Sequence, residues 1–304
     1  MLLKRLLAVV PVVFGVLLLT FLLVHLVPGD PVEVMLGESA AAADRSQLRT
    51  ELGLDQPLPL QFVDYLGRLA QGDLGRSIHT RTPIAQLLAE RLPATARLAL
   101  LALALALLVS LPLGVAAALH HRRWPDQLAT ASALTFSAMP HFWLGPLLML
   151  VFALWLPWLP VSGMDSPAAI VLPAVTLACG LTAILTRMTR ASLLEVLNED
   201  FVRTARAKGL PERSVILRHA LRAALLPVVT VVGLQLGSLL AGAVITETVF
   251  GWEGVGRLLV ESIEKRDYPV TQACVLVIAL SYVLVNLLTD LAYARLDPRV
   301  RFGA

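Results

Sequence analysis

The sequence has few charged residues. Only 15% of its 304 residues are Asp, Glu, Lys or Arg, whereas soluble domains carry about a quarter. Six long segments contain none of these four residues: 6–29, 98–121, 127–164, 166–186, 223–246 and 268–289. Each reaches the roughly 20 residues with which a helix crosses a bilayer, and helices pair their own backbone polar groups in lipid. We therefore predict an all-α polytopic membrane protein, with six transmembrane helices at about residues 6–27, 96–119, 127–156, 168–188, 223–246 and 269–291.

Cysteine and lysine are scarce as well. The two cysteines, Cys179 and Cys274, lie in apolar segments, which argues against a disulfide framework and against a thiolate nucleophile. The three lysines, Lys4, Lys208 and Lys265, do not stand in a Gly-x-x-x-x-Gly-Lys-Ser/Thr phosphate loop, so the chain itself is not an ATPase. It also contains no basic soluble domain of the kind that binds nucleic acid.

The absence of charged residues from the spans argues against other classes of membrane protein. Transporters driven by an ion gradient usually carry ionisable side chains within their spans and show internal repeats, and neither feature is present here. No segment resembles a channel filter. His25 and His141 stand alone, without neighbouring cysteines or carboxylates, so we interpret them as interior histidines and predict no metal site.

Basic residues predict the orientation of the spans. More than half of the 25 Lys and Arg residues fall at Lys4-Arg5, Arg122-Arg123, 187–222 and 295–301. Six spans place all of these segments on one side, which the positive-inside rule identifies as cytoplasmic, with both termini inside. A second span within 127–164 would move the 187–222 cluster outside. We therefore predict a single transmembrane domain over 1–304 with a retained first helix, an extracytoplasmic segment 28–93 and a cytoplasmic loop 194–222.

The most informative stretch is this cytoplasmic loop, called loop 194–222 below. It predicts a first helix from about Leu194 to Lys208, a left-handed position at Gly209 and a second helix that begins near Pro211. Arg203, Arg206 and Lys208 crowd the turn, whereas Ala205 and Ala207 keep it slim. Such a basic knob fits a groove on another protein, although an ordinary positive-inside loop is the alternative.

Small residues predict a site of helix packing in the fifth span. Gly233, Gly237 and Ala241 recur at intervals of four, so they share one helical face on which a neighbouring backbone can approach closely. The spacing does not tell whether that neighbour belongs to this chain.

Outside the membrane, residues 60–69 have the apolar spacing of an amphipathic helix that lies on the membrane surface. Segment 28–93 is either a scaffold over the spans or a docking surface for a soluble partner. The glycines at 251, 254 and 256 make the second outer segment, 247–270, conformationally permissive. Its acidic residues are either solvated charges or contacts for that partner.

Several motifs, taken together and in order, resemble the membrane permease subunits of binding-protein-dependent ABC importers, in the peptide/nickel branch. In loop 194–222, Arg203-Thr204-Ala205 stands where that family has a Glu-Ala-Ala signature, Gly209 is its glycine and Leu226-Pro227 its Leu-Pro. The family's acidic residue is absent, so the resemblance assigns Arg203 no individual role. The other matching pieces are Pro28-Gly29-Asp30-Pro31, Leu52-Gly53-Leu54-Asp55-Gln56-Pro57, Gly72-Asp73-Leu74-Gly75, Met139-Pro140-His141-Phe142-Trp143, Glu247-Thr248-Val249-Phe250-Gly251-Trp252, Arg266-Asp267-Tyr268-Pro269 and Leu296-Asp297-Pro298-Arg299.

The resemblance implies an ABC importer (MetI-like) permease fold in the cell inner membrane. It implies three kinds of partner: a second homologous permease, two ABC ATPases that use ATP and Mg, and an extracytoplasmic substrate-binding protein. This chain would bind no cofactor itself. The implied cargo is a di- or oligopeptide, with nickel or a metal chelate as the alternative within the family.

The resemblance also suggests which residues meet these partners. The ATPase-coupling residues would be Arg203, Thr204, Ala205, Arg206, Ala207, Lys208, Gly209 and Leu210. The candidate contacts for the binding protein are Gly251, Trp252, Glu253, Asp267 and Tyr268.

Overall fold

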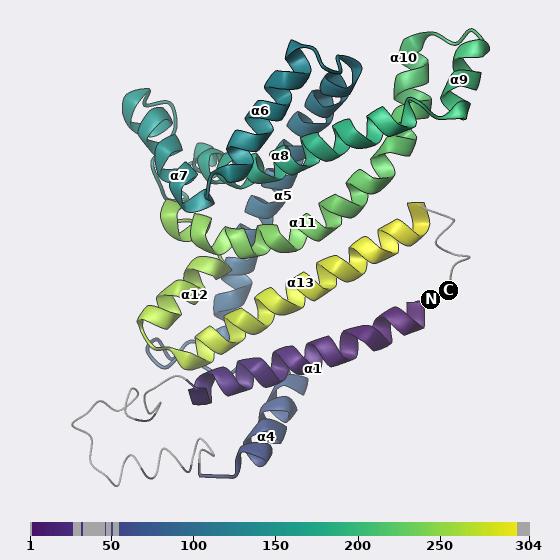
Figure 1. Cartoon of the computed structure of the whole chain (residues 1–304). Helices are drawn as coiled ribbons and strands as arrows, with labels where there is room; N and C mark the ends of the chain where they lie inside the picture. Colours follow the sequence, from purple (N-terminus) through teal and green to yellow (C-terminus); the bar gives the residue numbers. More distant parts are fainter. Residues whose placement is uncertain (1, 27–31, 33–45, 47–49, 51–54, 297–304) are drawn as a thin grey trace. The chain divides into compact units, whose positions relative to one another are not determined.

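The computed structural model describes residues 2–26, 32, 46, 50 and 55–296, and the expected features at 28–31, 51–54 and 297–301 lie outside these residues. The regular secondary structure of the described chain is helical, apart from one isolated bridge between Arg76 and Pro83 (Figure 1). Its α-helices are α1 (Leu2–Leu26), α4 (Leu58–Ala70), α5 (Ile84–Leu119), α6 (Trp124–Ala138), α7 (His141–Met149), α8 (Val171–Val196), α9 (Asp200–Ala207), α10 (Glu212–Ser214), α11 (Leu221–Phe250), α12 (Val255–Glu264) and α13 (Tyr268–Leu296). Two π-helical turns, η1 (Leu150–Trp155) and η3 (Val215–Ala220), and one 3-10 turn, η2 (Pro167–Ile170), complete the order.

The predicted class, an all-α membrane protein, is confirmed. Four stretches of helix are long and apolar enough to cross a bilayer: Ile84–Leu119, Pro167–Val196, Glu212–Gly237 and Tyr268–Thr289. A bent helix pair, α6 with α7 and η1, gives a fifth candidate, and α1 contributes a shorter apolar stretch, Val9–Leu22. The count of six spans and the position of both termini inside stay predictions.

The third predicted span, 127–156, differs from a straight helix. α6 and the α7–η1 helix meet at 105°, with the break at Met139 and Pro140. Pro140 has no N–H to donate, and it disfavours helical geometry at the residue before it. Met139 accordingly adopts an extended backbone with ψ of 119°.

Two compact units make up the described chain, one of residues 95–252 and 284–296 and the other of residues 2–94 and 253–283. In the second unit, one apolar cluster joins the start of α5 to α12 and to the first turns of α13, through Ile84, Val255 and Cys274 among others. In the same unit, Phe62 and Tyr65 of α4 pack against Phe21 of α1. The amphipathic segment 60–69 is therefore helical, with its aromatic face on α1.

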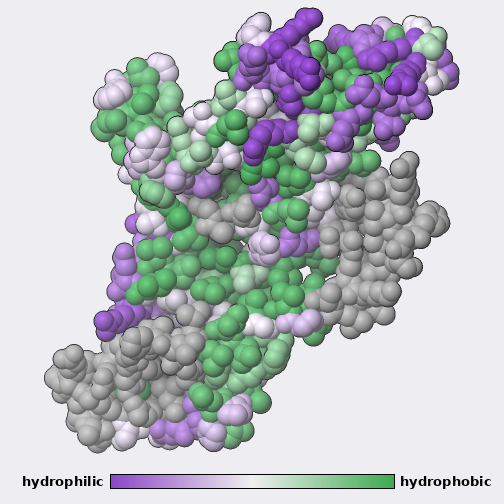
Figure 2. Space-filling view, viewed as in Figure 1, coloured by the Kyte–Doolittle hydropathy of each residue, from purple (hydrophilic) through white to green (hydrophobic). Residues whose placement is uncertain are grey.

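In the first unit, α8 packs against α6, α7 and α11. A close approach occurs at Gly114 of α5, where an added Cβ would lie 2.6 Å from the Cβ of Thr189 and 2.9 Å from the carbonyl oxygen of Thr186, both in α8. Figure 2 shows hydrophilic residues over α9, α10 and the α5–α6 turn at one end of this unit, and apolar surface along α11.

Candidate functional site: loop 194–222 and the helix ends around it

Loop 194–222 begins with a turn between two helices rather than with the single helix that was predicted. α8 continues to Val196, and α9 starts only at Asp200, so the prediction of one helix from Leu194 to Lys208 is wrong. Glu199 is extended, with ψ of 149°, which turns the chain between the two helices. The turn lets α9 place Val202 and Ala205 against apolar side chains of α8, which one continuous helix would not allow.

The end of α9 follows the predicted geometry. Gly209 has φ of +76°, and its N–H donates to the carbonyl of Arg206 at 2.9 Å. This left-handed conformation is easily reached only by glycine. Pro211 follows in an extended conformation with φ of −62°, and its carbonyl accepts from the N–H groups of Ser214 and Val215 at the start of the next helical segment.

The inner face of the loop is anchored in an apolar cluster. Val202 and Val215 are fully buried there, together with Ala118 at the end of α5 and Leu193 in α8. Ala205, only 6% exposed, belongs to the same cluster. Ala205 and Ala207 were expected to have the same role in the turn. Ala205 instead lies beneath the surface of the knob, whereas Ala207 is exposed. The loop is therefore packed in one core with the ends of α5 and α8 and with η3.

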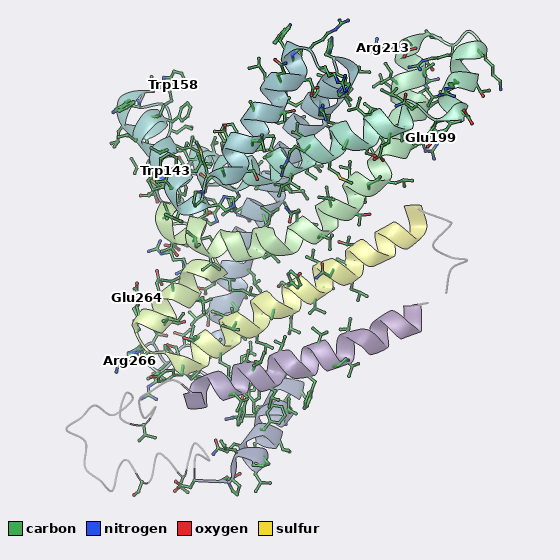
Figure 3. All side chains as sticks on the ribbon, viewed as in Figure 1. Trp143, Trp158, Glu199, Arg213, Glu264 and Arg266 are labelled. Carbon is green, nitrogen blue, oxygen red and sulfur yellow. The ribbon has the colours of Figure 1, made fainter. Side chains whose placement is uncertain are left out.

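The outer face of the loop is basic and partly paired with its own acids. Arg206 donates to Glu212 at 2.7 and 3.2 Å, and Arg203 donates to Asp200 at 3.2 Å. The hydrogen bond with Glu212 raises the pKa of the Arg206 guanidinium. Exposed residues of this face are Arg203, Thr204, Arg206, Ala207, Lys208, Gly209 and Leu210. Glu199 and Arg213, labelled in Figure 3, lie at its two ends and are also exposed.

A buried ion pair at the same end of this unit was not predicted. Asp126, at the start of α6, is 4% exposed and accepts from Nε and Nη2 of Arg190 in α8, the latter at 2.8 Å. Its Oδ2 also accepts from the backbone N–H of Arg122 at 2.8 Å, and His121 lies 3.4 Å away. The signal in the sequence was an acidic residue in the first turn of a helix, whose partner stands 64 residues further on.

The residues suggested as binding-protein contacts are mostly buried. Trp252 is 5% exposed, Tyr268 6% and Asp267 4%. Gly251 ends α11 in the left-handed conformation, with φ of +62°. Glu253 is exposed and pairs with Arg91 at 3.0 Å.

Asp267 ties two outer segments of the second unit together. Its carboxylate accepts from the hydroxyl of Ser77 at 2.5 Å and from the N–H of Ile78 at 3.2 Å, while His79 Nε2 lies 2.7 Å from the carbonyl oxygen of Lys265. Segments 28–93 and 247–270 therefore meet, and Glu264 and Arg266 stand exposed beside this junction (Figure 3).

Of the three small residues predicted to pack, Gly233 has a partner within the chain. A Cβ at this position would lie 1.7 Å from the Cγ2 of Thr289 in α13. Gly237 is buried, and the side chain of Ala241 lies outside the described part.

Family models match both parts of the chain. The family described as "Binding-protein-dependent transport system inner membrane component" matches residues 110–302. A second model, described as the N-terminal part of the membrane component of such systems, matches residues 1–99. The first match contains loop 194–222 and the buried residues of the apolar cluster that anchors it.

Curated relatives are similar over almost their entire length. The chain is 46% identical over 299 residues to the glutathione transport system permease protein GsiC of Pectobacterium atrosepticum, covering 98% of both chains. It is 45% identical over 300 residues to the protein of the same name from Salmonella typhimurium, covering 99% of this chain and 98% of that one. A solved structure described as an amino acid ABC transporter with histidines matches 71% of this chain and 94% of its own, with a TM-score of 0.52 and 17% identity, which supports the fold alone.

Proposed function

The chain belongs to the family of binding-protein-dependent transport system inner membrane components, the ABC importer permeases of the peptide/nickel branch, and from this premise we propose that it carries a small peptide across the inner membrane. The observation that carries the proposal is full-length similarity, at 45–46% identity, to permeases named for glutathione. Glutathione, a tripeptide, is therefore the first candidate for the cargo, ahead of other di- and oligopeptides.

In this proposal, the chain forms half of the path and draws its energy from contact. A second permease supplies the other half, two ABC ATPases bind and hydrolyse Mg-ATP, and a binding protein delivers the solute from outside. This chain binds no nucleotide itself. Six spans, with both termini in the cytoplasm, would put loop 194–222 on the ATPase side.

Loop 194–222 is the proposed point of contact with an ATPase. Its exposed basic face supports this role, since a partner can reach Arg203, Arg206 and Lys208. Its buried face supports the role too, because Val202 and Ala205 are packed on the ends of α5 and α8. A displacement of the docked loop would move these helix ends as one body, and such rigid-body motions are how packed domains alternate between states.

The test is transport by the reconstituted complex. The chain is co-expressed with the second permease, ATPases and binding protein encoded beside it, and labelled glutathione, a dipeptide, a tripeptide and Ni²⁺ are offered to proteoliposomes. We expect uptake of glutathione or another small peptide that requires both ATP and the binding protein and that survives a protonophore. Uptake of Ni²⁺ alone, or uptake driven by an ion gradient without ATP, would contradict the proposal.

A further inference from the structure

The break between α6 and α7 lies beside a cavity in the first unit. The cavity measures about 170 Å³ and is lined by the end of α6, the start of α7, and residues of α8 and α11. A cavity needs about 10–15 Å³ to admit one water, so this one has space for several waters or for one end of a short peptide. Figure 1 shows α7 beside α8 and α11, the helices that it contacts.

Polar groups gather here although the surrounding helices are apolar. Ser137, His141 and Gln235 line the cavity, and none of the described residues that line it is Asp, Glu, Lys or Arg. Polar side chains at membrane depth are costly, and they usually mark a solute path. An interrupted helix is likewise tolerated in a bilayer where it lines a cavity, and transporters build solute sites from such interruptions.

The position of His141 gives the cavity its hydrogen-bonding character. Its Nδ1 lies 3.2 Å from the carbonyl oxygen of Thr176. A carbonyl only accepts, so Nδ1 is the donor in this contact, and in the uncharged tautomer that donates through Nδ1 the other ring nitrogen, Nε2, is an acceptor. Gly180 makes room for the ring, because a Cβ there would lie 3.0 Å from Cε1 and 3.5 Å from Nε2 of His141.

The end of α6 adds further acceptors. The last four carbonyls of a helix have no partner within that helix, and Phe136, Ser137 and Met139 at this end all line the cavity. The helix dipole places partial negative charge at this end of α6, whereas α7 begins at His141 with the partial positive charge of a helix N-terminus. With no cationic side chain among the described lining residues, the cavity suits a ligand end that donates N–H groups.

We propose that the cavity at the α6–α7 break is a solute site of the permease, which receives the N–H-bearing end of a peptide, its α-ammonium or amide groups, on His141, Gln235, Ser137 and the carbonyls that end α6. The proposal rests on the peptide transport proposed above. It assigns to this cavity the role of holding the solute after the binding protein has released it.

Photo-crosslinking in the complete reconstituted complex tests the site. A photoreactive benzoylphenylalanine replaces Ile184, which lines the cavity, or Leu113, which lines a second, apolar cavity of about 220 Å³ between α5, α6 and α8, to which none of the polar side chains named above contributes. Radiolabelled glutathione, or whichever peptide the wild-type complex takes up, is supplied with the binding protein and ATP. We expect at least tenfold more labelled peptide on position 184 than on position 113.

Substitutions then connect the trapped peptide to named side chains. We expect His141→Phe, or Gln235→Leu, to lower the label on position 184 at least threefold, and His141→Gln, which keeps a hydrogen-bonding group, to retain most of it. Thr182→Val is the matched control, because Thr182 is on α8 but lines the apolar cavity. Gly180→Ala, which crowds His141 without removing it, is a second variant that keeps the test valid if His141→Phe does not assemble.

The outcomes separate this inference from the proposed function. No peptide uptake by the wild-type complex would overturn the proposed function and this inference with it. Uptake without label on position 184, equal label on positions 184 and 113, or crosslinks from position 184 only to the second permease would overturn the inference and leave the proposed function standing. Label that is unaffected by the substitutions at 141, 180 and 235 would also overturn it.

Discussion

Gly209 holds loop 194–222 in a shape that other residues reach only at a cost. Its φ of +76° lies in the left-handed region, while no atom lies within 4 Å of the position where a Cβ would stand. Strain in a substituted residue would therefore come from the backbone and not from a clash. For a residue other than glycine the left-handed conformation costs about 1–2 kcal/mol, and about 1.4 kcal/mol corresponds to a tenfold change in an equilibrium.

We accordingly expect Gly209→Val to lower ATP-dependent uptake by roughly tenfold while the protein still inserts in the membrane. Gly209→Asn should lower uptake less, because asparagine tolerates positive φ better than a β-branched residue does. Gly67→Val is the matched control, since Gly67 is also exposed and uncrowded but has no positive φ. Uptake by Gly209→Val at the wild-type level would show that the shape of this turn does not matter for coupling.

Single residues could be predicted where local backbone geometry decides their role. The left-handed Gly209 follows from a helix end, a glycine and a proline two positions later, and it is confirmed. Asp267 could not be assigned in this way. Its donors, Ser77 and Ile78, stand about 190 residues away, so its burial depends on how the chain folds back on itself.

Among the helices, α6 and α8 are joined at one end by the pair of Asp126 and Arg190. Removing one partner of a buried pair costs about 3–5 kcal/mol, because the remaining charge is left without compensation. The Arg190 side chain is 26% exposed, and the solvent screens part of this interaction, so we expect a loss near or below the lower end of that range.

Arg190→Ala should therefore lower the unfolding midpoint of the detergent-solubilised protein. The double variant Asp126→Leu with Arg190→Leu should lower this midpoint less, because no isolated charge remains buried. Arg187→Ala, at an exposed position one turn earlier on α8, is the control and should have little effect. If Arg190→Ala and Arg187→Ala unfold at the same midpoint, the pair does not join the two helices.

Helix positions followed from the apolar runs, whereas helix bends did not. A single span over 127–156 was expected, and the bend of 105° beside Pro140 depends on packing that the sequence does not display. Gly145 of α7 is one such contact, since a Cβ there would lie 3.0 Å from the ring of Phe250 in α11. The turn at Glu199 also depends on packing. It gives α9 a different direction from α8, and Val202 of α9 is thereby buried against α8.

For the whole molecule, the arrangement of the basic segments bears on membrane topology. Ala118, next to the basic α5–α6 turn, shares a core with Val202 and Val215 of loop 194–222, so these two basic segments lie at one end of the first unit. The opposite end of α11 is about 45 Å away at 1.5 Å per residue. There the Gly163 N–H donates to the carbonyl of Phe250.

Exposed tryptophans stand in the segment that leads to this second end. Trp155 and Trp158, which precede Gly163, are 70% and 69% exposed. Exposed tryptophans are typical of the level of the lipid headgroups. Trp124, which follows Arg122-Arg123 at the basic end of the unit, is 71% exposed. Exposed tryptophans therefore stand at both ends, as expected for a protein that spans the membrane, and only the basic residues tell which end is inside.

Cysteine labelling tests this topology directly. In a background with Cys179→Ala and Cys274→Ala, single cysteines are placed at exposed positions, Arg123 and Leu210 on the basic segments and Gln71 and Glu264 on the outer segments. We expect a membrane-impermeant maleimide to label the last two in right-side-out vesicles, and to label Arg123→Cys and Leu210→Cys only after permeabilisation. Labelling of both basic positions from outside would show that the protein has the opposite orientation in the membrane. Labelling of only one of these two positions from outside would place two segments that share a core on opposite sides of the membrane. No number of spans would then agree with both the packing and the positive-inside rule.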